Sequence, residues 1–196
     1  EVTMNRKDYI LFDLDGTLTD PKEGITKSVQ HALAHFGIQT DDLDSLTPFI
    51  GPPLRDSFKK YYGFSDEQAW EGVQAYREYF SVRGWVQNKE YPGIKEMLEA
   101  LKEAGRVLLV ATSKPEEFAR KILEHFDMAD YFDFIGGADM GETRVRKGDI
   151  IRYVLEQCGL EPDDETIGRC VMVGDREHDV LGAGECGMEC VGVLYG

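Results

Sequence analysis

Two carboxylates, Asp13 and Asp15, stand two positions apart directly after the apolar run 9–12. If that run is a buried strand whose geometry continues, both side chains point to the same side. Close carboxylates repel each other, so either one pKa rises or a cation binds. Gly16 then permits a tight turn that exposes backbone N–H groups. On the pair alone, an acidic turn that feeds a helix is the favoured interpretation.

Polar residues also follow other segments that read as strand ends or helix starts. Ligands in an open α/β sheet bind at the carboxyl ends of its strands, so these residues would converge on one edge. An assembly of carboxylates, a hydroxyl and a lysine is costly unless a metal or a substrate balances it. The further candidates are therefore Thr112, Ser113, Lys147, Asp175 and Asp179.

The elements that must position these residues alternate between short apolar runs and helical periods. Continuous apolar runs bounded by glycine or acidic residues are typical of strands buried on both faces. We expect strands at 9–12, 107–111, 131–135, 170–173 and 191–194, the third of them ending at Gly136 and Gly137. Helical periods between the runs predict an α/β fold with a doubly wound parallel sheet.

About ninety residues separate the first two expected strands, and they contain no convincing strand. Ser65 and Gln68 form a capping-box pattern before an apolar helical period, and Asp20-Pro21 resembles a helix start. We expect a Rossmann-like core of residues 4–19 and 89–196, with an inserted all-helical cap at 20–88.

The composition limits the possible partners. The 196 residues carry a net charge of −15, and 42% of them are hydrophobic. A chain this acidic has no electrostatic reason to bind nucleic acid or an anionic membrane. No apolar run has the ~20 residues that a membrane span needs. Four cysteines without zinc-site spacing indicate reduced thiols and a cytoplasmic protein. We expect a monomer or a homodimer.

The motifs together resemble those of the haloacid dehalogenase superfamily, in the branch of phosphatases with a helical cap after the first strand. The segment 13–17, Asp-Leu-Asp-Gly-Thr, matches the first family motif. Thr112 matches the second, Lys147 the third, and Asp175 with Asp179 the fourth. The order and spacing agree over nearly the whole chain. A narrower likeness, to bacterial phosphoglycolate phosphatases and 5′-nucleotidases, is carried by 51–54 and 173–179.

The resemblance implies a phosphate monoester hydrolase with an aspartyl-phosphate intermediate. Asp13 would be the nucleophile and Asp15 the general acid and base. Mg²⁺ would be bound by the Asp13 carboxylate, the Asp15 backbone carbonyl and Asp175. Thr112, Ser113 and Lys147 would bind the phosphate, and Asp179 would support Lys147 or a metal-bound water.

Substrate choice would come from the cap, where Arg55 and Lys59 stand four residues apart on an expected helix. A guanidinium at Arg55 could grip a substrate carboxylate, which favours phosphoglycolate as substrate. Solvated surface roles are as compatible with the sequence for Lys59 and nearly so for Arg55. The alternative substrate is a nucleoside monophosphate.

Three other activities share parts of this pattern. A sugar phosphomutase of the same superfamily would have every core motif and differ in its cap. A dehalogenase does not need the second acid, Asp15. A phospho-accepting signalling receiver also gathers acids, a hydroxyl and a lysine at a sheet edge, but it has no large cap and no such acid pair after its first strand.

Overall fold

The computed structural model describes residues 6–196, so the first two residues of the expected segment 4–19 lie outside the described part. The chain folds into two compact units. One comprises residues 6–19 and 90–196, and the other is residues 20–89. The short strands β2 (Thr19–Asp20) and β3 (Lys89–Glu90) pair where the chain passes between the units.

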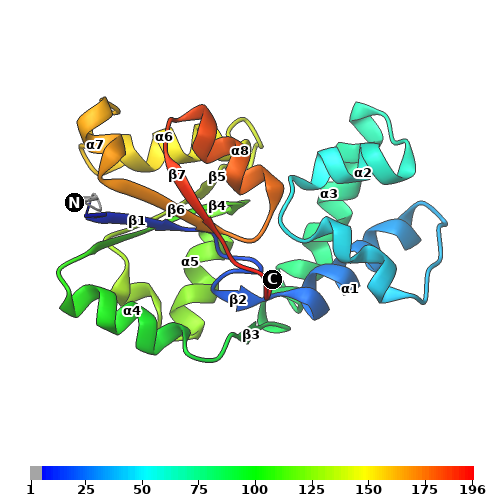
Figure 1. The fold of residues 1–196 in the computed structure, drawn as a ribbon. Coiled ribbons are helices and arrows are strands. Elements are labelled where there is room, and N and C mark those ends of the chain that lie inside the picture. Colours follow the sequence, from blue (N-terminus) through cyan, green and yellow to red (C-terminus); the bar gives the residue numbers. More distant parts are fainter. Residues whose placement is uncertain (1–5) are drawn as a thin grey trace. The chain divides into compact units, whose positions relative to one another are not determined.

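The first unit is built on a five-stranded sheet with the order β5-β4-β1-β6-β7 (Figure 1). All its paired strands are parallel, which confirms the doubly wound α/β fold. The central strand β1 is in register with both neighbours, because Tyr9 lies opposite Val107 on one side and Cys170 on the other. The strands are β1 (Tyr9–Phe12), β4 (Val107–Pro115), β5 (Phe134–Ala138), β6 (Cys170–Gly174) and β7 (Glu189–Gly192).

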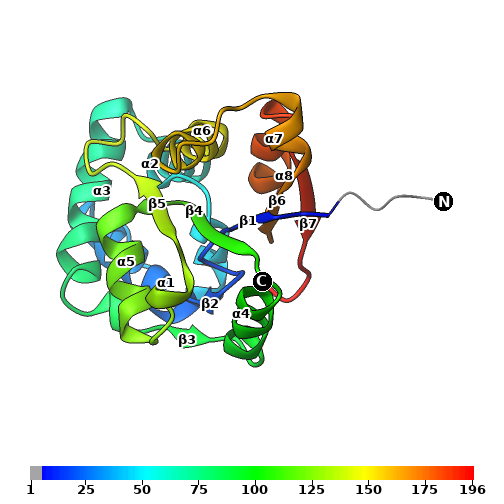
Figure 2. The same ribbon diagram turned by 90° about the vertical axis from the view of Figure 1, so that its left-hand side faces the viewer.

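Helices cover both faces of this sheet. On one face lie α6 (Lys147–Gln157), α7 (Asp164–Gly168) and α8 (Glu177–Glu185), and on the other α4 (Ile94–Glu103) and α5 (Glu116–His125), which leads into the 3₁₀ turn η3 (Ala129–Tyr131). Figure 2 shows α8 along β6 and β7. Buried side chains of α6, such as Ile151 and Val154, pack with Leu11, Leu109 and Met172 of the sheet. Burying this apolar surface fixes the strand ends that carry the polar residues.

Two expected strands were wrong in position. The third includes Gly136 and Gly137 rather than ending at them. Position 136 needs a glycine, because a Cβ there would lie 2.4 Å from Val154 Cγ2. The glycine is there for close packing of α6, not for a turn. The fifth strand is Glu189–Gly192, and Leu194 beyond it is fully exposed. An edge strand does not need a continuous apolar run, so its bounds carry a weak sequence signal.

The second unit is helical between its two connecting strands, as the sequence predicts. It contains α1 (Lys22–His35), η1 (Leu43–Phe49), α2 (Leu54–Tyr62), α3 (Asp66–Phe80) and η2 (Gly84–Val86). The expected capping box at Ser65 is confirmed, since the Ser65 hydroxyl accepts from Gln68 N at 3.2 Å and the Gln68 side chain accepts from Ser65 N. Buried aromatic rings of Phe49 and Phe58 pack edge to face in its core. Among the described residues, no helix is both long and apolar enough to span a membrane.

Candidate active site

The carboxyl end of β1 presents Asp13 to a buried lysine from another element. Asp13 N donates to Val173 O at 2.9 Å, which extends the pairing with β6 by one residue. Lys147, the first residue of α6, reaches the same place. Its Nζ lies 2.9 Å from Asp13 Oδ1 and 2.9 Å from Asp179 Oδ1, and it donates to Ala111 O at 2.8 Å. The end of β1, the middle of β4 and the helices α6 and α8 therefore meet at one ammonium.

The three charged groups change one another's protonation. Burial raises the pKa of Asp13 to about 7, against the opposing effect of Lys147. Burial acts to lower the pKa of Lys147, but the Asp13 and Asp179 carboxylates raise it above its usual range. Burial likewise acts to raise the pKa of Asp179, but Lys147 holds it below its usual value. Positive charge near Asp13, in addition to that of Lys147, would therefore keep the Asp13 carboxylate ionised.

Asp15 is held by a second buried lysine. Lys114 Nζ lies 3.0 Å from Asp15 Oδ2, and both side chains are almost completely buried. The other carboxylate oxygen, Asp15 Oδ1, is buried and has no hydrogen-bond partner among the described residues. Asp13 is arranged similarly, since its Oδ1 meets Lys147 and its Oδ2 is buried without a partner there.

The end of β6 brings Asp175 to the same loop. Thr17 Oγ1 donates to Asp175 Oδ1 at 3.1 Å, and Arg176 Nε lies 3.2 Å from Asp175 Oδ2 without the geometry of a hydrogen bond. Gly16 has a φ of +84°, and a Cβ on it would lie 2.3 Å from Asp175 Oδ2. Only glycine permits this close approach. Burial, and then the Asp179 charge, raise the pKa of Asp175.

The two hydroxyl residues in the second half of β4 have different surroundings. Thr112 is buried, and its Oγ1 accepts from Lys114 N at 3.1 Å. The Ser113 hydroxyl donates to Val145 O at 3.0 Å. Successive side chains of a strand point to opposite sides, which explains why Ser113 does not share the surroundings of Thr112.

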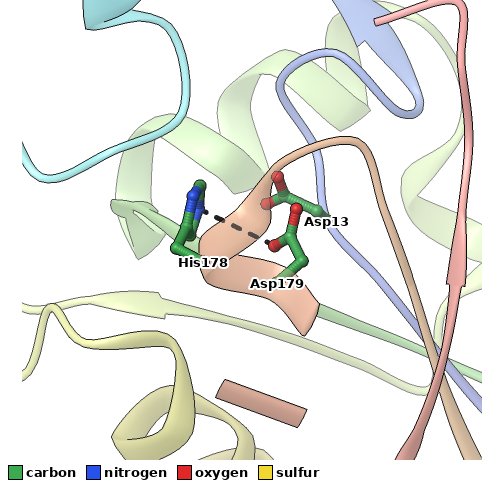
Figure 3. A group of neighbouring side chains, drawn as sticks. All are labelled: Asp13, His178 and Asp179. Atoms are coloured by element: carbon green, nitrogen blue, oxygen red, sulfur yellow. Dashed lines mark ion pairs between the residues drawn. The ribbon is translucent and has the colours of Figure 1, made fainter. Parts of the chain in front are cut away.

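A metal ion can be placed here in two ways. Asp13, His178 and Asp179 offer ligand atoms within 4.8 Å of one another (Figure 3). Burial, together with the Lys147 charge, lowers the pKa of His178 to about 4, so its contact with Asp179 at 3.7 Å is not an ion pair at neutral pH. Lys147 already neutralises both acids of this group, and Mg²⁺ prefers oxygen ligands to imidazole.

The second arrangement fits a hard cation better. Asp13 Oδ2 and Asp175 Oδ2 are buried and have no hydrogen-bond partner among the described residues. Buried carboxylate oxygens without partners are costly unless a cation or a donor satisfies them. Carboxylate oxygens such as those of Asp13 and Asp175, and a backbone carbonyl such as that of Asp15, are the kind of donor that Mg²⁺ prefers.

Arg55, the predicted substrate-reading residue, belongs to the second unit. There its guanidinium lies 5.6 Å from the centre of the Trp70 ring, and Arg77 lies 5.5 Å from the same ring. Lys59, one turn further along α2, forms an ion pair with Asp66. The structure thus places Arg55 on an aromatic platform and Lys59 in a surface pair.

Three basic residues near the start of α6 have separate partners. Arg144 donates to Gly137 O and lies 3.6 Å from the centre of the Tyr153 ring, and Arg146 pairs with Glu185. Among these three, only Lys147 is paired with Asp13. Sequence reasoning gave no role to Lys114 or to Thr17. The spacing of Lys114, two residues after Thr112 on a strand, was the available signal.

Comparison with known proteins identifies the family to which this chain belongs. The family model of the haloacid dehalogenase-like hydrolases matches residues 10–193. A 5′-nucleotidase of Pseudomonas aeruginosa is 51% identical over 95% of this chain and 82% of its own length. A phosphoglycolate phosphatase of Aquifex aeolicus is 33% identical, with 95% and 84% covered.

A relative with a different name is also similar. The tyrosine-protein kinase PtkA of Mycobacterium tuberculosis is 43% identical over 95% of this chain, which spans only 62% of that protein. Among solved structures, a predicted phosphatase from Clostridium acetobutylicum superposes with a TM-score of 0.93 at 48% identity, covering 97% of this chain and 86% of the other. This chain is therefore a haloacid dehalogenase-like hydrolase, and within that family it belongs with the phosphatases.

Proposed function

We propose that this protein hydrolyses a phosphate monoester in two steps, through a phosphoryl group carried on Asp13. The observation that carries the proposal is the state of the Asp13 carboxylate at the end of the central strand. One oxygen is anchored by Lys147 at 2.9 Å, and the other is buried without a partner among the described residues. A fixed carboxylate with one open oxygen is suited to attack phosphorus in line, and splitting the reaction replaces one difficult step by two easier ones.

The neighbouring residues supply the remaining chemistry. Asp15 donates a proton to the leaving oxygen and then takes one from the attacking water. The Thr112 hydroxyl and the Lys147 ammonium bind the phosphoryl oxygens, together with the backbone N–H of Ser113. Asp179 keeps Lys147 in place through their 2.9 Å contact. The bond from phosphorus to the leaving oxygen breaks as the Asp13 oxygen bonds to phosphorus. In the second step the water oxygen bonds to phosphorus, the bond between phosphorus and the Asp13 oxygen breaks, and inorganic phosphate is released.

We propose that Mg²⁺ is bound by Asp13, Asp175 and the Asp15 backbone carbonyl. A cation held there would neutralise charge on the phosphoryl group and so ease the approach of the anionic Asp13 carboxylate. The buried Asp175 Oδ2, which has no hydrogen-bond partner among the described residues, supports Asp175 as a ligand, and Asp13 would offer the cation the oxygen that does not attack phosphorus. The helical unit would act as a cap that excludes all water except the nucleophile.

The first substrate class to test is a nucleoside 5′-monophosphate. The support is the relative named 5′-nucleotidase, which is 51% identical over 95% of this chain. Phosphoglycolate is the second candidate, supported by a 33% identical relative of that name and by the guanidinium of Arg55 as a partner for its carboxylate. We do not extend the kinase activity named for PtkA to this chain, which spans only 62% of that protein.

The experiment measures phosphate release, with Mg²⁺, from the nucleoside monophosphates, phosphoglycolate and p-nitrophenyl phosphate. Wild type is compared with Asp13→Asn and with Asp130→Asn, which changes an exposed aspartate far along the chain. We expect hydrolysis by wild type and Asp130→Asn, and none by Asp13→Asn. Near-normal turnover by Asp13→Asn would overturn the proposed nucleophile, and a preference for phosphoglycolate would reverse the substrate order.

A further inference from the structure

We propose that Lys114 is a positioning residue of this reaction, which anchors Asp15 so that one carboxylate oxygen stays available to the leaving group. This inference rests on the proposed function, because it gives Lys114 a role only through the acid and base role of Asp15. Lys114 is the residue before the last of β4, and its Nζ lies 3.0 Å from Asp15 Oδ2.

The strand geometry accounts for the contact. Thr112 and Lys114 are two residues apart on β4 and are both buried, whereas Ser113 between them turns its hydroxyl to Val145 O. The alternation of a strand therefore sends the hydroxyl and the ammonium to the same side. The Thr112 hydroxyl also accepts from Lys114 N at 3.1 Å, which ties the two residues together locally.

The ion pair with Lys114 gives the two carboxylate oxygens of Asp15 different surroundings. Oδ2 is held by the Lys114 ammonium, and Oδ1 is buried with no hydrogen-bond partner among the described residues. Asp13 is arranged in the same way, with Oδ1 bound to Lys147 and Oδ2 without a hydrogen-bond partner among the described residues. Each of the two acids of the proposed mechanism thus has its own buried lysine, from the end of β4 for Asp15 and from the start of α6 for Asp13.

A role in stability alone would not account for this arrangement. A buried ion pair is often no more stabilising than apolar residues of the same size, because both charges must be desolvated. A general acid, in contrast, has to lie within hydrogen-bond reach of the oxygen that it protonates. An ammonium that fixes one oxygen removes the rotational freedom that would carry the other away from the substrate.

The test compares two leaving groups in Lys114→Met. An alkoxide needs a proton as it leaves, whereas p-nitrophenolate leaves readily without one. We expect kcat/KM for an alkyl phosphate to fall by about 30- to 100-fold and kcat/KM for p-nitrophenyl phosphate by less than about threefold. A phosphorylated enzyme should also accumulate with the aryl ester, seen as a burst of nitrophenol, since water activation also needs Asp15. Equal losses on both esters, or no loss on either, would overturn the inference.

Two further variants complete the design. Lys102→Met is the matched control, because it removes a lysine that pairs with Asp133 at 2.9 Å on the surface of the same unit. It should leave both rates unchanged. Asp15→Asn should show the leaving-group bias by itself. If it does not, the proposed role of Asp15 fails. If it does and Lys114→Met does not, only the role of Lys114 fails.

The double variant, Lys114→Met with Asp15→Asn, covers the case in which Lys114→Met does not fold. It removes both buried charges, so it leaves no carboxylate without a partner. If Lys114 acts only through Asp15, the double variant matches Asp15→Asn within about twofold on both esters. A further loss on either ester would mean that Lys114 has a function apart from Asp15 and would overturn the inference.

Discussion

The ion pairs of the two units differ in how far their charged side chains are exposed to solvent. At the sheet edge of the first unit, Lys147, Lys114 and their aspartate partners have side chains that are at most 7% exposed. In the helical unit, pairs such as Lys59 with Asp66 lie on the surface, with exposures of 43% and 73%. The ion pairs at this sheet edge are therefore shielded from water, whereas the pairs of the helical unit stay in contact with it.

The difference separates charges that serve chemistry from charges that serve solvation. Exposed pairs contribute little to stability, since water screens them and holding two long side chains costs entropy. Buried pairs carry a desolvation cost that mutual attraction barely offsets. A protein with a net charge of −15 has no need of further acids in its interior. The buried set is best explained by a reaction in which fixed charges act on a substrate in a site of low polarity.

The largest effect should follow removal of the metal. Treatment with EDTA should lower phosphate release by about 100-fold or more, since the cation offsets several kcal/mol of charge on the phosphoryl group. Added Mg²⁺ should restore the rate. Titration calorimetry should show weaker Mg²⁺ binding to Asp175→Asn than to wild type. Full activity in the presence of EDTA would show that hydrolysis does not need a metal ion.

Removing the lysine at the centre of the buried cluster should come next. Lys147→Met leaves Asp13 and Asp179 buried without their cation, and breaking such a pair costs about 3–5 kcal/mol. The midpoint of urea unfolding should fall accordingly, and turnover should be lost with it. An unchanged midpoint would mean that the cluster is hydrated, and the comparison between the two units would no longer hold.

A smaller and selective effect is expected at Arg55 in the helical unit. Arg55→Ala should lower kcat/KM for an anionic substrate by about 10- to 100-fold, the loss expected for one charged hydrogen-bonded contact. Hydrolysis of p-nitrophenyl phosphate should change much less. Equal losses on both would indicate that Arg55, stacked on Trp70, supports only the stability of its unit.

The smallest effect should follow loss of a surface pair. Lys59→Met removes the partner of Asp66 on the exposed side of α2 and α3. Because both groups stay in water, neither turnover nor the unfolding midpoint should change beyond the error of the measurement. A clear loss of activity on every substrate would show that exposed charges in this unit also matter for the reaction.

The sequence predicts some of these elements much better than others. The buried strands β1 and β6 were found nearly residue for residue, because they are continuous apolar runs. The sequence predicts a strand end at Gly136, because a single sequence cannot show that α6 packs against this glycine. The helix α8 was not foreseen, since Gly182 and Gly184 weaken its helical signal and its place is set by packing.

The same division applies to the candidate site. The acids of 13–17 and the other motif residues could be named from their types, their positions after predicted strands or at a helix start, and the family resemblance. The anchoring of Asp15 by Lys114 could not, because it depends on how far β4 continues past Ala111. The surroundings of Arg55 depend on Trp70, a residue fifteen positions away on another helix.

The most direct test of the account is to trap the phosphorylated enzyme. Asp15→Asn is mixed with p-nitrophenyl phosphate labelled in its phosphoryl group, and the reaction is quenched in acid within one turnover. The account predicts up to one label per chain, located at Asp13 by mass spectrometry and absent when Asp13→Asn is added to the same protein. Release of phosphate by an active protein without any label, or a label on another residue, would contradict it.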